Sequence, residues 1–97
     1  LVNNAGGALG LEKLHEGDPG DWDTMIDTNI KGLLYLTRKI VPLMLKYQLN
    51  GHVVNIGSIA GIAAYPNGAV YCATKAAVHC LSDGLRMDLV DKLILVT

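Results

Sequence analysis

The sequence predicts an α/β fold built on a parallel sheet, in the order strand, helix, strand, helix, strand. Three short apolar or β-branched runs, at residues 1–2, 52–57 and 92–97, have the character of buried strands. Two longer stretches, residues 22–47 and 70–90, carry apolar residues at helical spacing and separate these strands. Strands that alternate with helices in this way usually run parallel, because each helix returns the chain to the same end of the sheet.

Composition and charge narrow the function classes. The 97 residues are 51% hydrophobic and 18% charged, with a formal net charge of −1. This balance indicates a globular chain and gives no electrostatic reason to expect nucleic acid or an anionic membrane as a partner. Charged residues interrupt the apolar runs, so none is long enough to span a bilayer. The opening Leu1-Val2-Asn3-Asn4 lacks the basic region of a signal peptide.

The cysteines and histidines predict neither a disulfide nor a metal site. Cys72 and Cys80 lie eight residues apart in one predicted helix, which separates their Cα atoms by about 12 Å. We expect reduced, buried thiols, as in a cytoplasmic protein. His15, His52 and His79 lack the paired spacing of metal ligands.

The first half of the chain begins with a strand end and the small-residue turn "NNAGGALG", where backbone can approach a ligand closely. Residues 11–21 are expected to form a loop, with Asp21 as the N-cap of the first helix. Asn29 is a polar residue within the apolar face of that helix, either a functional side chain, a surface amide or a hydrogen-bonded kink. Pro42 is expected to kink the helix further on, whose wide apolar arc predicts packing on two sides.

The second half brings three chemically versatile side chains towards one edge of the sheet. Ser58 follows the strand "HVVNIG", at the carboxyl edge where open α/β sheets hold ligands. The next helix starts after the loop "SIAGIAAYPNGA", and its first turns carry Tyr71 and Lys75 on one face. An ammonium beside a phenol favours the phenolate, so such a tyrosine can exchange a proton with a carbonyl or alcohol oxygen. Taken alone, the pair also fits a lysine that packs its stem beside a half-buried tyrosine.

Four motifs occur in the order and spacing of the short-chain dehydrogenase/reductase family, which the chain resembles over nearly all of its length. They are "NNAG" after a strand, "TN" before "IKGLLYLTR", "VVNIGSIAG", and "YCATKAAV". More narrowly, "NNAGGALGLE", "DWDTMIDTNIKGL" and "NIGSIAG" resemble the branch of NADP-dependent 3-hydroxy acid, or serine-type, dehydrogenases. The resemblance implies a Rossmann-like doubly wound parallel sheet, of which the chain would form the central portion.

The resemblance also implies roles for individual residues. Ser58 would orient the substrate oxygen, Tyr71 would be the general acid/base, and Lys75 would favour the phenolate and bind the nicotinamide ribose. Asn29 would hold a water that relays protons towards Lys75. A further set, Asn4, Ala5 and Gly6, would lie against the cofactor, which is expected to be NADP, with NAD as the alternative. Family members commonly associate through these two helices, so a homo-oligomer, a dimer or tetramer, is implied.

The chain departs from the family pattern at both ends. It contains no Gly-rich phosphate-binding turn, and the glycines of "NAGGALG" have the wrong spacing for one. It also lacks the upstream residue that selects NAD or NADP and the downstream segment that shapes the substrate pocket. We therefore expect residues 1–97 to be a single partial Rossmann-fold domain from the middle of a larger protein.

Two functions remain after the motifs are weighed. A serine hydrolase is excluded, because Ile56 and Ala60 stand where a nucleophile elbow needs glycine around Ser58. In the first function, an oxidoreductase transfers a hydride between NAD(P) and a small hydroxy acid, alcohol or carbonyl substrate. In the second, a non-catalytic α/β fragment acts only in self-association or in packing with a partner.

Overall fold

The computed structural model describes residues 1–48 and 50–97. Its three strands are β1 (Val2–Asn3), β2 (Gly51–Asn55) and β3 (Ile94–Val96), which form one sheet in the order β1-β2-β3. Both pairings are parallel, with Val2 opposite Val54 and His52 opposite Leu95. The predicted parallel α/β order is thereby confirmed.

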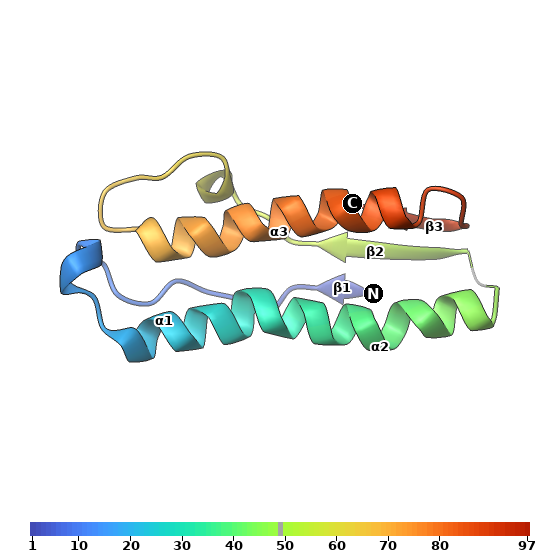
Figure 1. Cartoon of the computed structure of the whole chain (residues 1–97), viewed down its shortest axis with the longest axis horizontal. Coiled ribbons are helices and arrows are strands. Elements are labelled where there is room, and N and C mark those ends of the chain that lie inside the picture. Colours follow the sequence, from blue (N-terminus) through green and yellow to red (C-terminus); the bar gives the residue numbers. More distant parts are fainter. Residues whose placement is uncertain (49) are drawn as a thin grey trace.

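Helices connect the strands, and the first helix of each connection begins at the same end of the molecule (Figure 1). The first connection contains α1 (Pro19–Ile26), the π-helical turn η2 (Asp27–Lys31) and α2 (Gly32–Lys46), and the second contains α3 (Ala69–Asp88). The arrows of β1 and β2 point towards the end at which α1 and α3 start (Figure 1). The fainter strands lie behind the helices in this view, so the chain forms a helical layer on a sheet layer.

Two short 3-10 helices lie in the loops at this end. They are η1 (Leu14–Glu16), within the expected loop 11–21, and η3 (Ile59–Gly61), directly after Ser58. η3 therefore lies at the carboxyl edge of the sheet, where the sequence predicted a site, whereas η1 lies further from the strands, shortly before α1 begins (Figure 1).

The first helix differs from its prediction in two respects. Its N-cap is Asp18, not Asp21, and the Asp18 side chain accepts a hydrogen bond from the Gly20 amide at 3.0 Å. Pro19 explains the earlier start, because its fixed φ suits the first helical position. The irregular turn is η2, whereas α2 continues through Pro42 to Lys46.

The core lies under the sheet, where β2 and β3 meet α2 and α3. Its buried members are Val41, Val53, Leu89, Ile94 and Val96. Within the part of the chain that the structure describes, no helix is long and apolar enough to cross a membrane. Both cysteines are free, but only Cys72 is buried. The expectation of two buried thiols is therefore wrong for Cys80, which faces outwards from α3.

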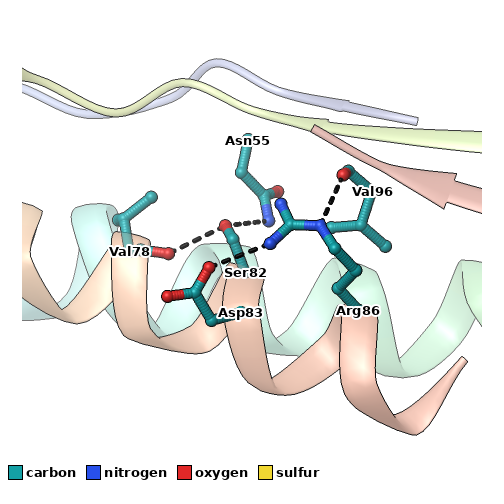
Figure 2. A network of polar contacts seen from close by, with 6 residues as sticks. All are labelled: Asn55, Val78, Ser82, Asp83, Arg86 and Val96. Atoms are coloured by element: carbon teal, nitrogen blue, oxygen red, sulfur yellow. Dashed lines mark hydrogen bonds and ion pairs between the residues drawn. The ribbon is translucent and has the colours of Figure 1, made fainter. Parts of the chain in front are cut away.

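A polar network joins β2 to α3 beside this core (Figure 2). Asn55 Nδ2 donates to Ser82 Oγ at 2.9 Å, and Ser82 Oγ donates to the Val78 carbonyl at 2.8 Å. One turn further on, Arg86 Nε donates to the Val96 carbonyl at 3.1 Å. These bonds fix the position of α3 along the direction of the strands. They therefore also determine where the first turns of α3 lie relative to the carboxyl ends of the strands.

Candidate active site

Tyr71 and Lys75 lie one turn apart on α3, as the sequence predicts. Lys75 Nζ is 6.0 Å from the centroid of the Tyr71 ring. Tyr71 is half-buried, whereas Lys75 is only 8% exposed. Lys75 Nζ also donates to the Ile56 carbonyl at 3.5 Å, in the segment that leads from β2 to Ser58. The ammonium of a buried lysine therefore approaches both the phenol ring and the exit of the central strand.

Ser58 is half-buried in the turn that follows β2. Its Oγ accepts a hydrogen bond from the Ala60 amide at 3.1 Å. Because a hydroxyl can accept and donate at once, this bond leaves the Ser58 proton free to donate to a further acceptor. The turn thus presents an oriented hydroxyl donor at the carboxyl edge of the sheet.

Asn29 is nearly inaccessible, with 2% of its surface exposed, and lies in the π-helical turn η2. Its Oδ1 accepts from the Gly7 amide at 2.9 Å, and its Nδ2 donates to the Gly7 carbonyl at 3.1 Å. Nδ2 also lies 3.0 Å from Thr74 Oγ1, which in turn donates to the Tyr71 carbonyl at 2.7 Å. Of the alternatives for Asn29, the surface amide is wrong, and the residue connects the "NNAGGALG" turn with α3.

Asn4, Ala5 and Gly6 form an exposed strip directly after β1. Gly6 packs so closely on the site that a Cβ there would lie 2.7 Å from Asn29 Oδ1 and 3.3 Å from Lys75 Nζ. Both side chains therefore lie against the same stretch of backbone. This close approach explains why position 6 requires glycine.

Sequence reasoning missed two residues of this arrangement. Thr74 links Asn29 to the backbone of α3, and His79 Nε2 lies 3.0 Å from the Ser58 carbonyl. Thr74 precedes the lysine inside the quoted "YCATKAAV", but nothing in that pattern indicates its partner. His79 repeats the four-residue spacing of Tyr71 and Lys75, which places it on their face of the helix but does not indicate its contact with Ser58.

Tyr65 is a second phenol close to α3. Partial desolvation, and then the neighbouring Cys72 and Tyr71, raise the pKa of Tyr65 above its ordinary value, although 46% of the residue is exposed. Tyr65 therefore keeps its proton at neutral pH and is less suited to acid/base exchange.

The chain is similar to known proteins over its whole length. A family model described as short chain dehydrogenase matches residues 1–97. An NADP-dependent 3-hydroxy acid dehydrogenase of Salmonella typhi is 54% identical over the whole chain, which spans 39% of that relative. A probable NADP-dependent dehydrogenase of Haemophilus influenzae is 52% identical over 89 residues, 92% of the chain and 35% of that relative.

The structural similarity is equally close. The closed form of a serine dehydrogenase complexed with NADP+ superposes with a TM-score of 0.95 at 52% identity, over 99% of this chain and 38% of that one. The Rossmann-like fold class predicted from the sequence is confirmed by this match. The chain spans less than half the length of the relatives that it resembles.

Proposed function

The chain belongs to the short-chain dehydrogenase family, and we propose that its complete protein transfers a hydride between NADP and a small hydroxy acid, alcohol or carbonyl compound. One observation carries the proposal. A buried lysine ammonium lies 6.0 Å from the ring centroid of a half-buried tyrosine, beside the segment that bears Ser58. The names of the Salmonella relative and the serine dehydrogenase favour NADP over NAD and a 3-hydroxy acid as substrate.

The proposed proton donor and acceptor is Tyr71. In the direction of reduction its phenol protonates the substrate oxygen, and in oxidation its phenolate removes the alcohol proton. Lys75 is proposed to support the phenolate by its charge, because its ammonium lies 6.0 Å from the centroid of the Tyr71 ring. Ser58 donates its free hydroxyl proton to the same substrate oxygen and so orients the substrate.

Asn29 and Lys75 are proposed to connect the site with solvent. Asn29 Oδ1 and Lys75 Nζ both lie against Gly6, at the inner side of the exposed strip after β1. Asn29 uses both amide protons on Gly7 and Thr74, but a carbonyl oxygen can accept a second bond. A water held at this oxygen would carry protons towards Lys75.

The residues after β1 fit a nucleotide cofactor. Asn4, Ala5 and Gly6 are exposed, and a Cβ on Gly7 would meet no atom within 4 Å. A strip of small residues with free space above it lets a flat ligand lie against the backbone. We propose that this strip and Lys75 hold the nicotinamide cofactor, which supplies or accepts the hydride.

Self-association is proposed as a second property of the complete protein. α2 exposes large apolar side chains that no described residue covers, and they include Leu34, Tyr35, Leu36 and Leu43. Exposed apolar surface of this kind is typical of an interface. The non-catalytic alternative would retain this property and lack turnover.

The experiment measures NADPH oxidation by the complete protein with 3-oxo acids and aldehydes, and NADP+ reduction with 3-hydroxy acids that include serine. Tyr71→Phe should lower kcat by about 10²–10⁴-fold, the usual contribution of a general acid/base. Tyr65→Phe is the matched control, since it removes a nearby phenol that has no role in the proposal, and it should leave kcat within about twofold.

Two results would contradict the proposal. Full turnover by Tyr71→Phe would remove the tyrosine from the reaction. No turnover and no NADPH binding by the wild-type protein would favour the packing function instead.

A further inference from the structure

His79 connects α3 with the turn that carries Ser58. Its Nε2 lies 3.0 Å from the Ser58 carbonyl oxygen, which also accepts from the Gly61 amide at 2.9 Å. A carbonyl can only accept, so this contact requires a proton on Nε2. Both the neutral Nε2–H tautomer and the imidazolium meet that requirement. The bond therefore does not depend on whether His79 is charged.

The glycines on either side of Ser58 fit around the imidazole. A Cβ on Gly57 would lie 2.8 Å from His79 Cε1, and one on Gly61 would lie 2.8 Å from His79 Nε2. The same Cβ on Gly61 would approach the Lys75 carbonyl oxygen to 2.7 Å. Contacts this short are not tolerated by a real Cβ, so the turn can pack on α3 around His79 only because both positions lack side chains.

The contact of His79 matters for the site because His79 lies on the same face of α3 as Tyr71 and Lys75. Tyr71, Lys75 and His79 are four residues apart and share one face of the helix. One face therefore carries the proposed acid/base, the ammonium beside it, and the side chain that holds the turn of the substrate-orienting serine.

We propose that His79 is a positioning residue, which fixes the Ser58 hydroxyl relative to Tyr71 by bonding the Ser58 carbonyl. The inference rests on the proposed function, because it assigns His79 a part in orienting the substrate through Ser58. Ser58 Oγ already accepts from Ala60 within the same turn, so a shift of the turn would move the hydroxyl with it.

The kinetic test compares four variants of the complete protein. His79→Leu removes the donor, whereas His79→Gln replaces it with an amide N–H at a similar reach. His79→Glu has the shape of Gln with no donor when ionised, so the Gln and Glu pair isolates the hydrogen bond even if the Leu variant folds poorly. His52→Leu, at the other end of β2, is the control, because His52 Nε2 bonds Thr97 Oγ1 and not the Ser58 turn.

Loss of the bond should lower kcat by up to roughly tenfold in the Leu and Glu variants, with the Kd for NADPH unchanged. The Gln variant should recover most of kcat. In a Ser58→Ala background the Leu substitution should have little further effect, because its consequence passes through Ser58. Equal losses with and without Ser58, or equal losses in Gln and Glu, would overturn the proposal.

Hydrogen exchange of residues 57–61 tests the contact without any turnover. The Leu and Glu variants should exchange about tenfold faster there than the wild type and the Gln variant, because one bond that closes the turn is lost. Unchanged exchange would overturn the role assigned to His79 and would leave the proposed function of the protein untouched. Faster exchange in a protein whose wild type has no reductase activity would instead overturn the proposed function, and with it the catalytic consequence of His79.

Discussion

Asn29 and Gly7 exchange a pair of hydrogen bonds across the site. The Gly7 amide donates to Asn29 Oδ1 at 2.9 Å, and Asn29 Nδ2 donates to the Gly7 carbonyl at 3.1 Å. A side-chain amide thereby takes the place that a neighbouring strand would have beside the "NNAGGALG" turn. Gly7 is thus fixed to η2, and this contact limits the conformations of the exposed strip of Asn4, Ala5 and Gly6 that precedes it.

Replacing Asn29 with leucine should destabilise the protein by about 2 kcal/mol. The change removes both bonds to Gly7 and the bond to Thr74, and each ordinary hydrogen bond contributes about 0.5–1.5 kcal/mol. Urea unfolding of the complete protein measures the loss, with Asn29→Asp as the partner variant that keeps the acceptor. A leucine variant as stable as the wild type would show that these bonds contribute nothing.

Gly6 and Gly7 offer a matched pair of substitutions. Gly6→Ala should cost about 1–3 kcal/mol, the usual cost of overpacking a tight contact, because its Cβ would lie 2.7 Å from Asn29 Oδ1. Gly7→Ala should be close to neutral, since its Cβ would meet no atom within 4 Å. Thermal unfolding of both variants distinguishes them, and similar melting temperatures would contradict this packing of Gly6.

Much of this arrangement could be predicted from the sequence, because it follows from local patterns. The β-branched run of β2 and the helical spacing around Tyr71 and Lys75 depend on side chains that are near in sequence. Parallel order then requires Ser58 and Tyr71 to share one edge of the sheet. These predictions needed only periodicity and the rule for crossovers.

The π-helical turn and the contact of His79 could not be predicted, because each depends on a distant partner. Asn29 meets Gly7, 22 residues away, and His79 meets Ser58, 21 residues away. A π-helical turn often lies at a functional position, but no residue type in the sequence predicts such a turn. The prediction of Asp21 as the N-cap was wrong for a simpler reason. Asp18 precedes a proline that starts the helix about one turn earlier than the apolar pattern suggests.

Ser82→Ala should destabilise the protein by about 1–3 kcal/mol. Ser82 is buried, and its hydroxyl satisfies Asn55 Nδ2 (Figure 2), so alanine would leave a polar group without its partner. Ser82→Thr keeps the hydroxyl and is the control. Chemical denaturation checks the difference, and an unchanged midpoint for the alanine variant would show that Asn55 readily finds another partner.

Gly84→Ala should stabilise the protein by about 0.5–1 kcal/mol. Gly84 lies within α3, where alanine loses less backbone entropy on folding, and a Cβ there would meet no atom within 4 Å. Gly61→Ala is the contrasting variant, because its Cβ would approach the Lys75 carbonyl oxygen to 2.7 Å. Denaturant midpoints that fall for both substitutions would mean that the α3 surface at Gly84 is covered in the complete protein.

The stability of the protein should decrease in alkali partly through Tyr65. The pKa of this phenol is raised in the folded state, first by partial desolvation and then by Cys72 and Tyr71. The unfolded chain therefore loses this proton first as the pH rises past the ordinary tyrosine value of about 10. Ionisation then favours unfolding, so the contribution of Tyr65 to the stability of the folded state is complete below pH 10 and is lost as the pH rises through its folded pKa.

Melting temperatures of wild type and Tyr65→Phe, measured between about pH 8 and 11, should diverge only above pH 10. The phenylalanine variant should be less sensitive to alkali. Parallel curves across that window, or a Tyr65→Phe variant that becomes more sensitive to alkali, would contradict the raised pKa.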